Sequence, residues 1–309
     1  MTMIKARPAG SGKKARTAFT AGAAVVLLVL LVLAAKWLRG LEGVQDFLGE
    51  YTGHSTLPEG APVGLPAWLG WQHFLNGFFL QLMVRTGWLV RTTTRPAAYW
   101  TRNNKGLFRT KGAPKKISLD LWFHLTLDAL WVLNGLAFMV LLLATSQWMR
   151  IVPTSWDIFP NAVSALLQYA SLDWPLESGW VNYNALQVLA YFLTVFVAAP
   201  LALVSGLRMS PAWPKNTRRL NKVFPIEAAR TIHLPVMFYF VAFVVVHVFL
   251  VLATGALRNL NHMYAGRDDG GWAGVALFAV SLVVMVAGCL MARPLFLRPL
   301  ASLTGKVSR

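Results

Sequence analysis

The sequence predicts an all-α, polytopic transmembrane bundle of about six helices. Hydrophobic residues make up 56% of the 309 residues and charged residues only 13%, whereas soluble domains carry about 25% charged residues. Long apolar segments of membrane-spanning length alternate with short polar segments. The basic residues concentrate in every second polar segment, which is the charge pattern of a multi-pass membrane protein.

Six apolar segments are long enough to cross a hydrocarbon core of about 30 Å. We expect transmembrane helices over residues 18–37, 69–90, 119–146, 183–207, 226–255 and 272–292. A further short helix over residues 162–169 is expected to lie on the outer membrane surface. The chain then divides into three parts: an N-terminal part over residues 1–67, a transmembrane domain over residues 68–293 and a basic tail over residues 294–309.

The first apolar segment follows a basic N-terminus, a pattern shared by cleaved signal peptides and retained signal anchors. The cations ahead of it are Lys5, Arg7, Lys13, Lys14 and Arg16. The run is long and has no clean small-x-small cleavage site before Lys36, which favours a retained anchor. Both interpretations leave the orientation of the following helices unchanged.

Charge predicts the orientation of the bundle. The loop after the second helix contains eight cations and no acid, namely Arg91, Arg95, Arg102, Lys105, Arg109, Lys111, Lys115 and Lys116. Residues 208–222 and the tail are also basic, whereas residues 39–68 and 147–182 are mildly acidic. The positive-inside rule then places both termini in the cytoplasm of a bacterial cell and the chain in its cytoplasmic membrane.

Composition also excludes several classes of function. The net charge of +17 arises from clusters between apolar segments, so anionic membrane lipid is the expected partner and nucleic acid is not. Cys289 is the sole cysteine, which rules out a disulfide within the chain and cysteine-ligated iron–sulfur sites. No CxxCH motif occurs, so c-type haem is excluded as well.

The fifth predicted helix carries two histidines, His233 and His247, 14 residues apart. Fourteen residues of α-helix return a side chain to within about 40° of its starting face and rise about 21 Å. One helix therefore presents an imidazole near each membrane surface. Histidine inside hydrocarbon is costly unless its nitrogens are engaged, and neutral imidazole is a haem ligand. Two stacked b-type haems explain the spacing, and hydrogen-bonded histidines within a bundle are the alternative.

Depth matching pairs these histidines with two others. His73 is expected near the outer end of the second helix and His124 near the inner end of the third. Because a bis-histidine haem needs two imidazoles at one depth, His73 pairs with His247 and His124 pairs with His233. His262 is an alternative to His247, although it is expected beyond the end of the fifth helix. Small residues that would let a flat macrocycle approach occur at Gly77, Gly87 and Gly135.

Charged residues near these histidines are candidates for supporting roles. Asp128 follows His124 by four residues and shares its helix face, so it is a candidate to exchange protons with a quinone or to hydrogen-bond a ligating imidazole. Arg230 is our first candidate to pair with the propionates of the inner haem, and Arg208 and Arg85 are alternatives. Anchoring to lipid headgroups is an equally compatible role for these arginines. For the outer haem the candidates are Arg258 and Asn259.

Three segments carry a recognisable pattern: residues 230–260 with the two-histidine helix, residues 71–87 beginning Trp71-Gln-His73, and residues 183–211 ending Ser205-Gly-Leu-Arg-Met-Ser-Pro211. They resemble core helices of the prokaryotic cytochrome b561-like family, which includes the cytochrome b subunits of formate dehydrogenase, nickel–iron hydrogenase and thiosulfate reductase. In that family four histidines on three helices hold two b haems. By motif, these ligands fall on His73, His124, His233 and His247.

The resemblance implies a four-helix haem-binding core and an electron-transfer subunit without catalysis of its own. Its partners would be the quinone pool and a redox enzyme subunit of the molybdopterin, iron–sulfur or nickel–iron type. A membrane transporter or a structural anchor without haem is the rival interpretation. Transporters usually show an internal repeat or paired broken helices, and neither pattern is visible here.

Overall fold

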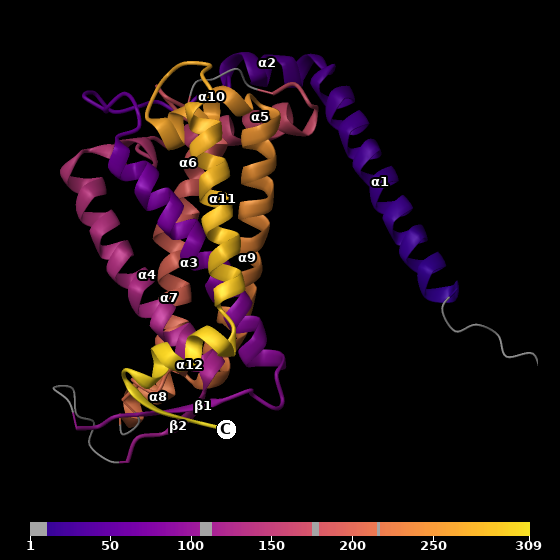
Figure 1. Cartoon of the computed structure of the whole chain (residues 1–309). Helices are drawn as coiled ribbons and strands as arrows, with labels where there is room; N and C mark the ends of the chain where they lie inside the picture. The colour runs from indigo at the N-terminus through magenta and orange to yellow at the C-terminus, as the bar shows by residue number, and fades with distance from the viewer. Residues whose placement is uncertain (1–10, 106–112, 175–178, 215–216) are drawn as a thin grey trace, which may run out of the picture. The chain divides into compact units, whose positions relative to one another are not determined.

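The computed structural model describes residues 11–105, 113–174, 179–214 and 217–309, with side chains from residue 15 onward (Figure 1). Within these ranges the chain is all-α apart from three short strands. Five of the cations on which the predicted orientation rests lie outside the described residues, namely Lys5, Arg7, Arg109, Lys111 and Lys215. The side chains of Lys13 and Lys14 also precede the described ones.

Five helical segments are long and apolar enough to cross a membrane, namely Ala15–Arg39, Leu119–Ala144, Ala185–Met209, Ile226–Ala253 and Ala273–Met291. They confirm five of the six predicted crossings to within a few residues. The remaining predicted crossing is the 26-residue helix α3 (Ala67–Thr92), which has the length but is not among the five. Its polar side chains Gln72, Asn76, Gln81 and Arg85 lower its hydropathy.

The described chain forms two compact units. The first takes its residues from Met1–Leu57, Pro153–Glu177 and Tyr183–Leu189, and the second from Pro58–Val152, Ser178–Asn182 and Ala190–Arg309. These units differ from the three parts expected from the sequence, whose boundaries stay a prediction.

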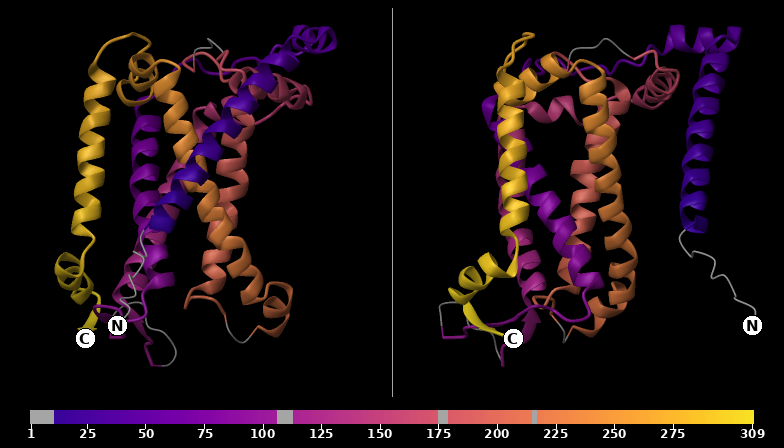
Figure 2. Two further views of the ribbon diagram at one scale, coloured as in Figure 1. Left: turned by 90° about the vertical axis from the view of Figure 1, so that its right-hand side faces the viewer. Right: turned by 45° about the vertical axis from the view of Figure 1, so that its right-hand side comes forward.

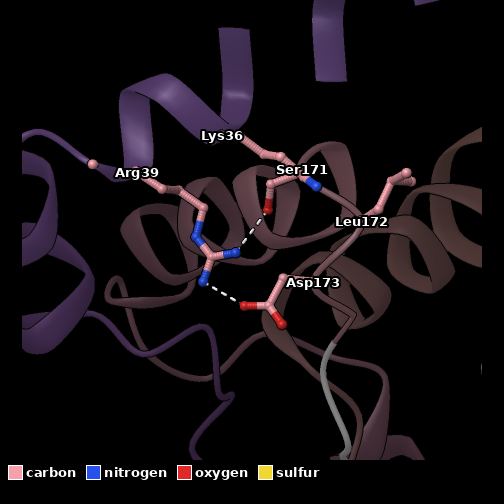
Figure 3. A pocket seen from close by; sticks show the side chains of 6 residues that line it. Lys36, Arg39, Ser171, Leu172 and Asp173 are labelled. Atoms are coloured by element: carbon pink, nitrogen blue, oxygen red, sulfur yellow. Dashed lines mark hydrogen bonds and ion pairs between the residues drawn. The ribbon is translucent and has the colours of Figure 1, made fainter. Parts of the chain in front are cut away.

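The first unit contains α1 (Ser11–Arg39), α2 (Glu42–Glu50), α5 (Ile158–Ala170) and the first turns of α6 (Ala185–Phe192). Helix α5 confirms the short helix predicted over residues 162–169. Arg39 at the end of α1 forms a 2.6 Å ion pair with Asp173 and donates a 2.7 Å hydrogen bond to Ser171. Figure 3 shows these side chains with Lys36 and Leu172 around a small pocket. Residues from the two mildly acidic loops therefore meet, as expected of loops on one side of a membrane.

The second unit is a helical bundle of α3, α4 (Leu119–Ala144), α7 (Ala199–Met209), α9 (Ile226–Ala253) and α11 (Ala273–Met291). Helix α3 packs against α4 and α11, and α7 packs against α9. A π-helical segment, η2 (Leu193–Ala198), joins α6 to α7. Prolines mark the helix starts, with Pro66 capping α3 and Pro225 capping α9, because proline is tolerated where no intrahelical N–H bond is needed.

A small antiparallel sheet closes one end of this bundle (Figure 2). Its strands β1 (Tyr99–Arg102), β2 (Lys116–Ser118) and β3 (Gly305–Ser308) lie in the order β2-β1-β3, with Trp100 opposite Val307. Helices α8 (Arg218–Val223) and α12 (Pro294–Ser302) lie at the same end. The basic loop and the basic tail are therefore at one end of the bundle, as their charge predicted, although neither the sheet nor α12 was expected.

The opposite end of the bundle is built around α10 (Ala256–Leu260), the π-helical η3 (Asn261–Ala265) and the 3₁₀ turn η1 (Gln147–Arg150) (Figure 1). Arg150 is 1% exposed. Its guanidinium donates to the carbonyl oxygens of Gly64 at 2.7 Å and Gly179 at 2.5 Å. These charge-assisted bonds to backbone tie together the loops before α3, after α4 and before α6.

Candidate functional site

The structure brings four histidines together as two facing pairs. The ring centroids of His73 on α3 and His247 on α9 are 6.1 Å apart. Those of His124 on α4 and His233 on α9 are 6.5 Å apart. These are the pairs that depth matching selected from the sequence, and α9 contributes one histidine to each pair.

The separation of the rings fits a metal held between two imidazoles. A transition metal binds an imidazole nitrogen at about 2.0 Å, and the ring centre lies about 1.1 Å behind that nitrogen, so a metal bound from both sides separates the rings by about 6.2 Å. The observed separations of 6.1 and 6.5 Å are close to this value. Among the described residues no group of three or more histidine, cysteine or carboxylate side chains surrounds a metal position. Two imidazoles alone suit a metal whose other ligands come from a macrocycle.

The inner histidines each form a hydrogen bond that fixes their tautomer. Thr86 Oγ1 lies 2.9 Å from His124 Nδ1, and Ser205 Oγ lies 2.9 Å from His233 Nδ1. Each hydroxyl also donates its one hydrogen to a backbone carbonyl of its own helix. Thr86 donates to Leu82 at 2.8 Å, and Ser205 donates to Leu201 at 2.5 Å. The hydroxyls must therefore accept from the Nδ1–H groups, which leaves the lone pair on each Nε2 for a metal.

A glycine follows each of these two hydroxyl residues and lets the helix approach the imidazole. A Cβ placed on Gly87 would lie 3.3 Å from His124 Cε1, and one on Gly206 would lie 3.3 Å from His233 Cε1. The Thr86-Gly87 pair on α3 and the Ser205-Gly206 pair on α7 thus seat the two inner histidines in the same way.

These hydroxyl contacts were missed by sequence reasoning, which considered three glycines and neither hydroxyl. Of those glycines Gly87 contacts an inner histidine, whereas Gly77 approaches only Met285 and Gly135 has nothing within 4 Å of a Cβ position. A sequence signal for these contacts does exist. Thr86-Gly87 and Ser205-Gly206 are both hydroxyl–glycine pairs, and both lie near the expected inner end of a helix.

The outer histidines lie among aromatic rings. Phe243 stacks on His247 at 5.5 Å with an angle of 6° between the planes, and Tyr191 meets the same ring edge-on at 6.1 Å. Tyr264 of η3 meets His73 edge-on at 5.8 Å. Burial raises the pKa of Tyr264 against a smaller opposing effect of its hydrogen bond with Ser281, so this phenol stays neutral. These rings cover part of both outer imidazoles.

One nitrogen of the outer pair lacks a partner. His73 Nδ1 is buried and forms no hydrogen bond within the described structure. A buried imidazole nitrogen without a partner costs free energy, and a metal bound at this nitrogen would remove that cost. A haem-type macrocycle between His73 and His247 fits this observation together with the ring distance.

Asp128 lies beside the inner pair but not in the position expected of an orienting group. Its Oδ2 is 3.8 Å from His124 Nε2, beyond hydrogen-bonding distance, and Thr86 already occupies Nδ1. The side chain is 37% exposed. The hydrogen-bonding role foreseen for Asp128 is therefore filled by Thr86, and proton exchange is the remaining candidate role for this carboxyl.

The three arginines considered for the inner propionates differ in their present contacts. Arg85 donates to the Ala292 carbonyl at 2.7 Å. Arg208 donates to the Phe224 carbonyl at 2.6 Å and lies over the Trp213 ring at 5.0 Å. Arg230 is exposed and forms no hydrogen bond or ion pair with the described residues, so of these three it alone is unengaged.

Two candidates for the outer end, Asn259 and His262, also have contacts that define their present roles. Asn259 donates to the Val251 carbonyl at 2.9 Å and to Thr254 Oγ1 at 3.0 Å, so it caps the end of α9. His262 is 3% exposed and its Nε2 lies 2.6 Å from Asp268. His262 is therefore engaged away from His73, and His247 is the outer partner.

No family model matches the chain, and comparison with curated proteins and with solved structures found no match. The resemblance to cytochromes b accordingly stays an expectation, and the geometry of the two histidine pairs carries the functional argument.

Proposed function

We propose that this chain is a membrane electron-transfer subunit that holds two b-type haems, one between His73 and His247 and one between His124 and His233. The observation that carries the proposal is the pairing itself. Two histidine pairs, sharing α9, each have the ring separation of a bis-imidazole metal site. One haem between each pair would explain why a single helix carries two histidines that each face a histidine of another helix.

A haem b held by two histidines would supply one-electron transfer, and with both histidines bound it would offer no open coordination site to a substrate. The protein would position the two haems and determine the surroundings of each. Helix α9 sets the two sites about 21 Å apart along its axis. Thr86 and Ser205 orient the inner imidazoles, and Tyr191, Phe243 and Tyr264 cover part of the outer pair. Arg230 supplies a free cation one helical turn from His233.

The proposal includes a cellular setting. The charge pattern favours the bacterial cytoplasmic membrane with both termini in the cytoplasm. The terminal partners are the quinone pool and a membrane-associated redox enzyme subunit, as the likeness to the cytochrome b561-like family implies. The chain itself carries out no catalysis.

The test is haem analysis of single histidine variants. The purified protein is expected to contain two protohaems by pyridine extraction and to show a reduced α-band typical of low-spin haem b. His247→Ala is expected to remove the outer haem and His233→Ala the inner one, each leaving the other largely in place. His54→Ala is the control, because His54 is an exposed loop residue that belongs to the other compact unit. A well-folded protein without protohaem would contradict the proposal and favour a transporter or an anchor.

A further inference from the structure

Several buried polar atoms gather between α3 and α4 without hydrogen-bond partners. They are Trp68 Nε1 and Gln72 Oε1 on α3, and Asn134 Nδ2 on α4. Trp68 and Gln72 are one helical turn apart, so they share a face of α3. Gln72 as a whole is only 8% exposed. Buried polar groups in native proteins nearly always have partners, and each exception requires an explanation.

The contacts of the two helices place Gln72 and Asn134 at the same level. On one side the rings of Trp68 and Phe138 are 6.2 Å apart. On the other side Trp131 Nε1 donates a 3.1 Å hydrogen bond to Asn76 Oδ1. The two helices run antiparallel, so the middle of the segment from Trp68 to Asn76 on α3 faces the middle of residues 131–138 on α4. Gln72 lies at the middle of the first segment, and Asn134 at the middle of the second.

An acceptor and a donor at one level would be expected to bond each other if their role were only to join the helices. Gln72 Oε1 and Asn134 Nδ2 do not bond each other or any other described group. The cost of leaving both unpaired in an apolar surrounding is high. The arrangement is instead suited to a ligand that offers an acceptor to Asn134 and a donor to Gln72.

We infer that α3 and α4 form a binding site for a quinone headgroup at the level of the outer histidine pair. This inference rests on the proposed function, since it names where the quinone binds. A quinone carbonyl accepts a hydrogen bond from Asn134 Nδ2 or Trp68 Nε1. A quinol hydroxyl donates one to Gln72 Oε1. The oxidised quinone therefore satisfies the donors Asn134 Nδ2 and Trp68 Nε1, and the quinol satisfies the acceptor Gln72 Oε1 as well.

The surroundings of the site fit a ligand that arrives from the lipid. Leu133 and Leu136, on either side of Asn134 along α4, are 63% and 60% exposed and offer an apolar surface to an isoprenoid tail. Gly135 has nothing within 4 Å of a Cβ position, so the next position along α4 is also open. Gln72 precedes His73 directly, so the headgroup lies beside the outer pair. Asp128, the earlier candidate for quinone chemistry, belongs to the inner pair instead.

The experiment measures quinone affinity and stability in the same variants. The full chain is reconstituted in nanodiscs and titrated with decylubiquinone and, separately, with menaquinone-2, each in its oxidised and its reduced form, with binding followed by calorimetry and thermal unfolding. Gln72→Leu and Asn134→Leu remove the orphaned atoms with little change in volume. Gln81→Leu is the matched control, because the Gln81 amide has a partner in the Met285 carbonyl at 3.0 Å. Haem content is measured for every variant.

For the quinone type that the wild type prefers, we expect Asn134→Leu to weaken binding of the oxidised and the reduced form, and Gln72→Leu to weaken binding of the reduced form, each by about tenfold or more. Without quinone they should unfold at a temperature equal to or above that of the wild type, because an unpaired buried atom is removed. Gln81→Leu should show the reverse pattern, with lower stability and unchanged affinity. This combination separates a ligand site from a structural one, which a stability measurement alone does not.

Two results would overturn the inference. If both variants bind quinone like the wild type while retaining two haems, the site is elsewhere and the proposed function stands. If they lose stability and keep their affinity, the polar atoms are satisfied by buried water and serve only packing. Absence of haem from the wild type would contradict the proposed function instead, and the quinone affinity of that protein would still decide this site.

Discussion

At the scale of single residues, the hydroxyls of Thr86 and Ser205 decide which nitrogen the inner histidines present. Replacing Thr86 by Val keeps the shape of the side chain and removes the acceptor for His124 Nδ1–H. We expect haem affinity at the inner site to fall by about 10- to 100-fold, the usual effect of losing a partner of a metal-ligating histidine. The midpoint potential of the remaining inner haem should rise, because a less basic imidazole stabilises ferric iron less well. Haem content and a redox titration of the α-band measure both effects.

The control for this substitution is Thr126→Val on α4. The Thr126 hydroxyl donates only to the carbonyl of Trp122 in its own helix, at 2.9 Å, so its loss should leave both haems unchanged. Equal effects of the two substitutions would show that the Thr86 hydroxyl has no special role. An unchanged inner haem in Thr86→Val would contradict the tautomer assignment.

At the scale of secondary structure, the C-terminal strand β3 holds the basic end of the bundle together. It pairs with β1 from Tyr99 to Arg102, and the indole of Trp100 donates to the Ala301 carbonyl at 3.0 Å. Removing residues 303–309 leaves one edge of β1 without backbone partners. We expect trypsin to cleave the loop over residues 91–118 several times faster in this truncated chain, while the spectra of both haems stay the same. Equal cleavage rates would show that the sheet does not protect the loop.

Helices and strands differ here in how far the sequence predicts them. The transmembrane helices were predictable because a chain in lipid must satisfy its backbone internally and carry apolar side chains over a fixed length. The strand pairing was not, because β1 and β3 are about 200 residues apart and each is only 4 residues long. The four histidines followed from helix geometry and bilayer thickness. Thr86 and Ser205 did not, since hydroxyls in membrane helices ordinarily bond their own backbone, and these two do that as well.

At the scale of the whole molecule, exposed apolar surface and charge together describe a membrane protein. The lipid-crossing helices expose large side chains such as Leu133, Val245 and Val283, at 63%, 64% and 69%. Soluble monomers rarely expose contiguous apolar patches of more than a few hundred Å². The sheet joins the basic loop to the tail at one end of the bundle, and on the basis of the positive-inside rule we propose that this end faces the cytoplasm.

This assignment predicts the outcome of reporter fusions. Green fluorescent protein fused after Arg309 should fluoresce in living bacteria, because that reporter folds in the cytoplasm and not after export through the general secretory route. The same reporter fused after Leu172, in the loop predicted to be outside, should be dark, and alkaline phosphatase at these two points should give the opposite pattern. Replacing Lys115 and Lys116 by Gln weakens the basic cluster and should raise the fraction of inverted molecules. A dark fusion at Arg309 with an intact, membrane-inserted chain would reverse the orientation, and with it the side on which the inner histidines lie.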